Sequence, residues 1–351
     1  MRMRYLGRTG LQVSEICLGT MTFGGRHGFQ HMGRLNTIEA RRLVHRSMDA
    51  GVNFFDTADM YSAGQSEEVL GAALGDRRED VVIATKVRWQ MPDGSSGPND
   101  RGLSRHHIVR SVEASLRRLG TDYIDLYQTH GWDGRTPWEE TLRALDDLVR
   151  AGKVRYVGAS NLTSWQLTRA LATSERQGLE RFASHQIQYS LAAREVEWEL
   201  LPMAEAEEVG VMVWSPLAGG LLSGHQERDG RPPAGTRRAV GYFEPVDPER
   251  TFDTIEVLRE IAKKREVSPA QVALRWVLEG RGVTSVVIGA RNERQLTENL
   301  AATTWSLTEE ERTALDGVSA PPLPYPYWHQ EYCDADRVRE PEETSGERDG
   351  E

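Results

Sequence analysis

The sequence has few cysteines and few lysines. Cys17 and Cys333 are the only cysteines among 351 residues, too few for a disulfide framework, which favours a reducing compartment such as the cytoplasm. Only four of the 43 basic residues are lysines, so arginine supplies nearly all the positive charge. Lysine is therefore not the residue that this chain uses for its general positive charge, and the position of Lys86 calls for a functional explanation.

Apolar runs of membrane length are missing as well. The longest run, 209–222, is interrupted by Ser215 and Pro216 and is shorter than the roughly 20 residues that a membrane helix needs. The first residues are rich in arginine and contain no apolar signal core. We expect a cytoplasmic protein that has no membrane partner.

Two glycine motifs that bind nucleotides are not found. The sequence contains no GxGxxG, the fingerprint of a dinucleotide-binding Rossmann domain. Residues 219–225 have the glycine spacing of a phosphate-binding loop, but His225 stands where that loop needs lysine. These observations argue against a Rossmann dehydrogenase and against a P-loop NTPase.

Negative charge is in excess and unevenly distributed. The net charge is −10, and the segment 334–351 carries eight acidic residues and three arginines, which is half of that total. Proteins that bind nucleic acid neutralise phosphates with clustered Lys and Arg, so we expect no nucleic-acid polymer as partner. The acidic tail is expected to be disordered from about residue 334.

Short apolar runs alternate with amphipathic helical patterns, which is typical of parallel βα units. Eight such units over about 290 residues predict a closed (β/α)8 TIM barrel, preceded by a β-hairpin (4–6 and 12–15) that closes its bottom. The predicted strands are 16–19, 53–56, 81–85, 123–128, 154–158, 184–187, 211–214 and 285–288. The predicted helices are 37–50, 66–74, 105–119, 138–151, 164–177, 195–209, 253–264 with 269–279, and 293–301.

The domain organisation follows from this alternation. We expect a barrel domain at 1–320 and a C-terminal extension at 321–351 whose first, aromatic part (321–328) could cross the barrel mouth. Loops 88–102 and 225–250 exceed the usual length, which is typical of functional lids or of disordered segments.

Four polar residues stand out near the ends of predicted strands: Asp56 after the run 53–55, Tyr61 five positions further on, Lys86 after 81–85 and His130 after 124–129. Catalytic groups of βα barrels lie at the carboxyl ends of the strands. An ammonium about 4 Å from a phenol contributes roughly 4 kcal/mol at an effective dielectric of about 20, enough to bring the pKa of the phenol toward neutrality. Tyr61 could then act as a proton donor, with Asp56 holding Lys86 charged and His130 donating a hydrogen bond to the same oxygen.

These residues lie in motifs that resemble the aldo-keto reductases, in the branch of the potassium-channel β subunits and bacterial general reductases. The motifs are 55–61 (Phe-Asp-Thr-Ala-Asp-Met-Tyr), 84–86 (Ala-Thr-Lys), 124–130 (Ile-Asp-Leu-Tyr-Gln-Thr-His) and 154–161 (Val-Arg-Tyr-Val-Gly-Ala-Ser-Asn). The resemblance extends from about residue 3 to 304. It implies that Asp56, Tyr61, Lys86 and His130 form a catalytic tetrad.

The resemblance also implies a site for NADPH and no metal. Ser160, Asn161 and Gln186 would hold the nicotinamide carboxamide, Trp214 would stack on the ring, and Arg237 would clamp the phosphates. Arg291 would pair with a 2′-phosphate, which favours NADPH over NADH. His225 replaces a lysine that family members often have near the phosphates. The remaining cofactor residues are Gly19, Thr20, Met21, Asp56, Ser215, Leu217, Gly219, Ser223, Gly289, Gln295, Glu298 and Asn299.

The activity implied is NADPH-dependent reduction of an aldehyde or ketone to an alcohol, with a small-molecule carbonyl compound as substrate. Phe23, Trp89 and Trp132 are the candidate substrate residues. Two alternatives stay open: a nucleotide-sensing binding subunit with vestigial activity, and a keto-sugar reductase of a biosynthetic pathway. Nothing in the sequence indicates an oligomer.

Overall fold

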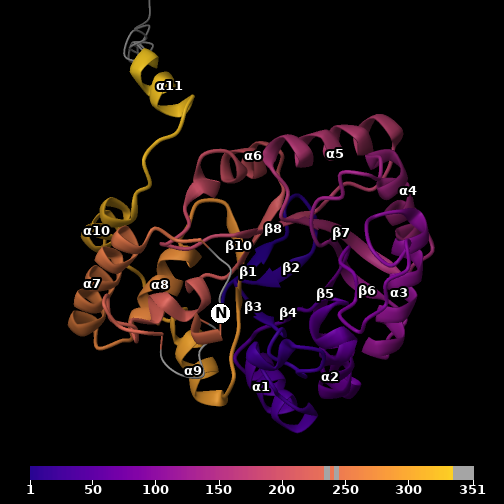
Figure 1. Cartoon of the computed structure of the whole chain (residues 1–351), viewed down its shortest axis with the longest axis horizontal. Helices are drawn as coiled ribbons and strands as arrows, with labels where there is room; N and C mark the ends of the chain where they lie inside the picture. The colour runs from indigo at the N-terminus through magenta and orange to yellow at the C-terminus, as the bar shows by residue number, and fades with distance from the viewer. Residues whose placement is uncertain (233–237, 241–244, 335–351) are drawn as a thin grey trace, which may run out of the picture. The chain divides into compact units, whose positions relative to one another are not determined.

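The eight apolar runs form the strands of one closed parallel barrel, as predicted (Figure 1). The computed structural model describes residues 1–232, 238–240 and 245–334. Around the barrel the strands follow the order β10-β3-β4-β5-β6-β7-β8-β9. Their bounds are β3 Ile16–Gly19, β4 Phe54–Asp56, β5 Val82–Val87, β6 Ile124–Thr129, β7 Val154–Ser160, β8 Ser184–Gln188, β9 Gly210–Trp214 and β10 Val283–Ile288.

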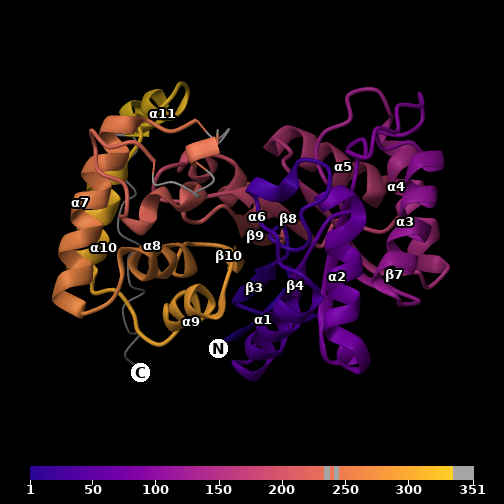
Figure 2. The same ribbon diagram turned by 60° about the horizontal axis from the view of Figure 1, so that its bottom comes forward.

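Helices cover the outside of the barrel, and Figure 2 shows α1 and α2 beside β3 and β4. Their ends carry the expected caps: Asn36 forms a capping box at the start of α1, and Ser268 followed by Pro269 opens α8. The bounds are α1 Thr37–Asp49, α2 Gln65–Leu74, α3 Arg105–Leu119, α4 Trp138–Arg150, α5 Ser164–Gln177, α6 Leu200–Ala206, α7 Pro248–Arg265, α8 Pro269–Leu278, α9 Glu293–Ala301 and α10 Glu309–Ser319.

Two helix predictions need correction. The helix expected at 195–209 is a 3-10 turn, η4 (Glu195–Glu197), followed by the short α6, because Pro202 has no N–H to donate and fits only the first turn of a helix. The helix expected from residue 253 begins at Pro248, where Asp247 caps it. Helix α10 was not predicted.

The hairpin closes the bottom of the barrel, as predicted. It consists of β1 (Met3–Tyr5) and β2 (Gln12–Ser14), and its residues Leu6 and Val13 pack with barrel-interior residues such as Phe54. Gly7 has a φ of +58°, and a Cβ there would lie 2.7 Å from the carbonyl oxygen of Ala183. Only glycine fits this close approach to the amino end of β8.

The chain divides into a unit Met1–Ser319, which holds the barrel, and a unit Ala320–Glu351. The second unit contains α11 (Tyr327–Asp334). The tail expected to be disordered lies, apart from its first residue, outside the described residues, as do parts of the long loop 225–250.

Candidate active site

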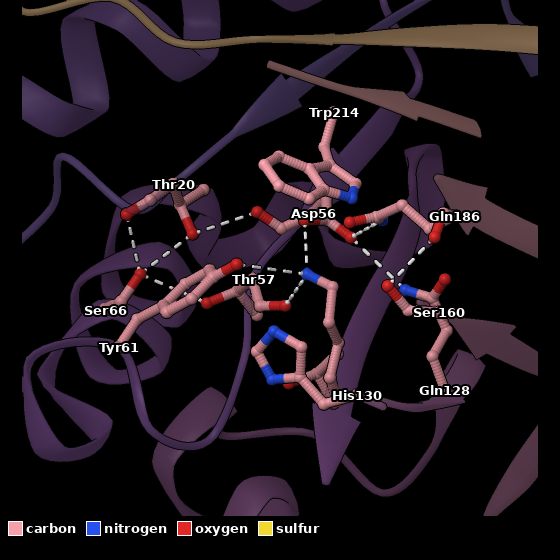
Figure 3. Close-up of polar contacts among 12 residues, drawn as sticks. Thr20, Asp56, Thr57, Tyr61, Ser66, Gln128, His130, Ser160, Gln186 and Trp214 are labelled. Carbon is pink, nitrogen blue, oxygen red and sulfur yellow. Dashed lines mark hydrogen bonds and ion pairs between the residues drawn. The ribbon is translucent and has the colours of Figure 1, made fainter. Parts of the chain in front are cut away.

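The four candidate catalytic residues meet at the carboxyl ends of neighbouring strands (Figure 3). Asp56 ends β4, Lys86 lies near the end of β5, and His130 directly follows β6. Tyr61 begins the 3-10 turn η2 (Tyr61–Gly64) that follows β4. Parallel register carries these side chains to one end of the barrel, because Asp56 pairs with Ala84 two residues before Lys86.

Lys86 is completely buried and its ammonium has three partners. Its Nζ donates to Asp56 Oδ1 at 2.5 Å and to the Thr57 carbonyl at 2.7 Å, and lies 3.5 Å from the Tyr61 hydroxyl. Burial by itself would lower the pKa of Lys86, but the charges of Asp56 and Tyr61 outweigh it and raise the pKa above its usual value. The side chain is therefore an ammonium at neutral pH.

Asp56 joins the two sides of the barrel. While Oδ1 contacts Lys86, Oδ2 accepts a hydrogen bond from Gln186 Nε2 on β8 at 2.7 Å and one from Gln128 Nε2 on β6 at 3.2 Å. Gln128 was not among the predicted residues, although it pairs in register with Lys86. The carboxylate is held rigidly by these three partners.

His130 contacts the ring of Tyr61 edge to face, with ring centroids 5.8 Å apart. Burial, and then the charges of Lys86 and Arg88, hold the pKa of His130 well below its usual value. The imidazole is therefore neutral at neutral pH, and it can donate one hydrogen bond without carrying charge.

The turn after Tyr61 has a strained backbone. Ser62, Ala63 and Gly64 all have left-handed φ values, of 52°, 54° and 86°. A Cβ at Gly64 would lie 2.5 Å from Cδ of Arg118, whose Nε donates to the buried Glu67 at 2.6 Å. The turn that carries the phenol is thus packed against α3.

The residues expected at the nicotinamide form one chain of hydrogen bonds. Asn161 Nδ2 donates to Ser160 Oγ at 2.8 Å, and Ser160 Oγ donates to the Gln186 carbonyl at 3.0 Å. Trp214 is half-buried at the end of β9, and its Nε1 donates to Asn161 Oδ1 at 3.0 Å. Asn161 itself has a φ of +56°, so its backbone is held in a conformation that functional sites often use. Figure 3 shows Trp214 on the opposite side of Asp56 from His130.

The segment after β9 makes a sharp turn of left-handed residues. Ser215, Ala218, Gly219 and Gly220 all have positive φ values, and Gly219 N donates to Ser215 Oγ at 3.3 Å. This turn includes Leu217 and leads into Ser223, whose Oγ lies 2.9 Å from Nδ1 of the exposed His225. Arg237, expected to clamp the phosphates, lies outside the described residues.

The residues expected around adenosine gather where β10 leads into α9. Arg291 N donates to Gln295 Oε1 at 2.9 Å, and Asn299 Nδ2 donates to the Gly289 carbonyl at 3.3 Å. The Arg291 guanidinium donates to the His31 carbonyl at 3.0 Å. Glu298 is half-buried on the same helix.

Three further cofactor candidates follow β3. A Cβ at Gly19 would lie 2.8 Å from Val287 Cγ1 of the neighbouring strand. Thr20 is buried, and its Oγ1 donates to the Asp56 carbonyl at 3.1 Å. Met21 is half-buried.

The three candidate substrate residues differ in exposure. Phe23 has no exposed surface and belongs to the hydrophobic core, and Trp132 is half-buried against Trp138 and Trp165. Only Trp89 is both exposed and next to the tetrad, with its ring centroid 6.4 Å from that of His130.

No helix of the described residues is long and apolar enough to cross a membrane. Within the same parts of the chain, no group of three or more His, Cys, Asp or Glu residues is arranged to hold a metal ion.

A parallel eight-stranded barrel with a buried Lys–Asp pair, a tyrosine and a neutral histidine at its carboxyl end has the architecture of a barrel oxidoreductase. Residues 15–320 match the model of the Aldo/keto reductase family, and the chain belongs to that family. Members generally use a nicotinamide dinucleotide to reduce carbonyl groups.

Several named proteins are similar over most of their length. "Uncharacterized oxidoreductase YrpG" of Bacillus subtilis is 42% identical over 88% of this chain and 93% of its own. "Probable voltage-gated potassium channel subunit beta" of Oryza sativa is 39% identical over 86% and 91%. "Versiconal hemiacetal acetate reductase" of Aspergillus parasiticus is 35% identical over 92% and 98%.

Proposed function

We propose that this protein is an NADPH-dependent reductase that converts an aldehyde or ketone to an alcohol, with Tyr61 as the general acid. The observation that carries the proposal is the 3.5 Å separation between the Lys86 ammonium and the Tyr61 hydroxyl, with Lys86 held by Asp56. A neighbouring ammonium favours the phenolate, which makes the phenol a better proton donor near neutral pH.

Each member of the tetrad has a defined task in this proposal. Tyr61 gives its hydroxyl proton to the carbonyl oxygen, and Lys86 stabilises the phenolate that remains. His130, neutral because of its burial, donates a hydrogen bond to the same oxygen. Asp56 keeps the ammonium in place.

The residues at the barrel rim fit a dinucleotide. Trp214 is half-buried and oriented by Asn161, as a ring-stacking residue should be. The left-handed turn at Ser215 and 218–220 holds the candidate residues Ser215, Leu217 and Gly219 in one compact loop directly after Trp214. When bound, the dinucleotide would supply the hydride. We assign Ser160, Asn161 and Gln186 to the carboxamide and Arg291 to the 2′-phosphate, within a reductase domain at 1–320.

The test is Tyr61→Phe. We expect NADPH affinity, measured by quenching of tryptophan fluorescence, to be unchanged, and kcat to fall by about 100-fold or more. Tyr5→Phe, at an exposed tyrosine of the hairpin, is the matched control and should behave as wild type. Wild-type turnover in Tyr61→Phe would refute the assignment of the acid.

A second candidate function is a nucleotide-sensing subunit with vestigial reductase activity, favoured by the similarity to the rice protein named as a channel β subunit. Turnover at saturating substrate separates the two. A kcat below about 0.01 per second, far under the usual range for enzymes, would favour the sensing subunit.

A further inference from the structure

Arg88 is a cation directly beside the tetrad. It follows β5, the strand that carries Lys86, and it is half-buried. Its Nε donates to the Trp132 carbonyl at 3.0 Å, which fixes the guanidinium on the segment that follows β6 and His130. The charge of Arg88 also helps to hold down the pKa of His130.

The guanidinium of Arg88 lies on an aromatic face. Its Cζ is 3.7 Å from the ring centroid of Trp89, a stacked cation–π contact. The same indole meets the His130 ring edge to face and is 41% exposed. Trp89 therefore forms an accessible apolar surface between the candidate proton-donor site and the charge of Arg88.

Within the described parts of the chain, Arg88 has no carboxylate at ion-pair distance. Other poorly exposed arginines do have one: Arg118, Arg194 and Arg275 each lie 2.6–2.8 Å from a glutamate. Burial, with a further contribution from Arg101, lowers the pKa of Arg88, and Asp133 opposes this effect. A partly buried cation usually has a partner, because desolvating it alone is unfavourable.

Asp133 cannot easily become that partner. Its Oδ2 accepts from Leu103 N at 2.6 Å and from Thr136 Oγ1 at 2.7 Å, and its Oδ1 accepts from Arg135 N at 3.1 Å. The carboxylate thus already accepts hydrogen bonds from its own turn and from Leu103, which precedes α3. Of the three guanidinium nitrogens of Arg88, only Nε donates a hydrogen bond within the described structure, so both terminal nitrogens keep donor capacity.

We propose that Arg88 is a specificity-determining residue that binds an oxyanion of the substrate, so that the preferred substrates are carbonyl compounds bearing a carboxylate or phosphate. The inference rests on the proposed function. The carbonyl lies at Tyr61 and His130, the connecting atoms lie on Trp89, and the planar guanidinium receives the oxyanion through two parallel hydrogen bonds.

The experiment compares substrates that differ in charge but hardly in shape. 4-Formylbenzoate is paired with its methyl ester for the carboxylate, and glyceraldehyde 3-phosphate with glyceraldehyde for the phosphate. We expect the wild-type protein to have a higher kcat/KM for the anion of at least one pair, and the pair that shows it identifies the oxyanion. Relative to the value for the neutral partner, Arg88→Gln should lower that kcat/KM about tenfold or more.

Two variants act as controls. Arg88→Lys keeps the charge but loses the planar fork, so it should fall between wild type and Arg88→Gln. Arg101→Gln removes a nearby exposed cation and should leave the preference intact. Since Arg88 also acts on His130, all kcat/KM values are taken over a pH series, and the neutral substrate corrects for that effect.

The outcomes separate this inference from the proposed function. If the wild-type protein reduces none of the four compounds, the proposed function itself fails. If it reduces the neutral compounds without preferring either anion, or if Arg88→Gln lowers both members of a pair equally, the role of Arg88 is refuted. If Arg88→Gln does not fold, competitive inhibition of the wild-type protein by benzoate but not benzamide decides the question, and equal inhibition would overturn the inference.

Discussion

Lys86 and Asp56 are in direct contact inside the mouth of the barrel, with Nζ 2.5 Å from Oδ1 and both side chains almost without exposed surface. A buried ion pair of this kind is expensive to break from one side, because the remaining charge has no counter-ion. The same contact sets the protonation of the lysine, since the charge of Asp56 offsets the effect of burial on its pKa.

We therefore expect Asp56→Asn to lower both stability and activity. The free energy of unfolding should fall by about 3 kcal/mol in urea titrations, because the ammonium is left buried without its carboxylate. Without the charge of Asp56, the effect of burial dominates and lowers the pKa of Lys86. As the pH rises, Lys86 should then lose its proton earlier, so kcat should begin to fall at a lower pH than in the wild type. Asp80→Asn, at an exposed carboxylate, is the control. Unchanged stability would mean that Thr57 and Tyr61 alone satisfy the ammonium.

The turn that carries Tyr61 gives a second prediction, for Gly64→Ala. An added Cβ would lie 2.5 Å from Arg118 Cδ in addition to the strain of a left-handed φ. Gly94→Ala is a matched control, because Gly94 has a φ of +92° and the added Cβ would have no atom of the described residues within 4 Å. Gly94→Ala should cost about 1 kcal/mol of unfolding free energy from backbone strain, and Gly64→Ala clearly more. Only Gly64→Ala should also reduce kcat, by displacing Tyr61, and equal effects of the two variants would contradict a role for the Arg118 contact.

The strands could be predicted because each is a largely apolar run, and the meeting of the four candidate residues could be predicted because Asp56, Lys86 and His130 lie at or next to the carboxyl ends of three successive strands. Period-two alternation also contained a signal for Gln128, because it lies on β6 two residues before His130, which directly follows the strand. Helix α10 had a signal too, because Thr308 and Glu311 form reciprocal capping hydrogen bonds.

Other features of the site depend on contacts between distant segments. The close approach of Gly64 to Arg118 joins residues on α3 and the Tyr61 turn, and no local pattern encodes it. Likewise, Phe23 was a candidate substrate residue, but whether a loop residue points to solvent or to the core is decided by packing, and Phe23 lies in the core. That no carboxylate of the described residues pairs with Arg88 is also visible only in three dimensions.

His185 makes stability depend on pH. Burial lowers the pKa of His185 to about 3, from an ordinary value of 6.5, and its Nε2 accepts a hydrogen bond from Leu162 N at 3.1 Å. As the pH falls below 6.5, His185 takes up a proton in the unfolded chain, but in the folded chain it does so only at about pH 3. The free energy of unfolding is therefore undiminished by His185 above pH 6.5 and decreases as the pH falls toward 3.

Between pH 7 and pH 5 the loss from His185 should be about 2 kcal/mol of unfolding free energy. Burial also lowers the pKa of His130 and raises that of Asp59, so the total pH dependence is a sum. The measurement is therefore the difference between wild type and His185→Gln in urea titrations at both pH values, with exposed His106→Gln as control. Parallel pH dependence of wild type and His185→Gln would exclude this role.

Arg291 gives the last prediction, on the choice between NADPH and NADH. Its backbone N–H is held by Gln295 and its guanidinium reaches the His31 carbonyl, so the side chain is fixed at the rim where β10 ends. If it pairs with the 2′-phosphate, Arg291→Gln should raise the KM for NADPH by about tenfold or more, the cost of losing a charge-assisted contact, and leave the KM for NADH unchanged. Arg294→Gln, three residues further along at an exposed position, should change neither value. An equal rise in KM for NADPH and NADH would show that Arg291 supports the structure of the rim but does not bind the 2′-phosphate.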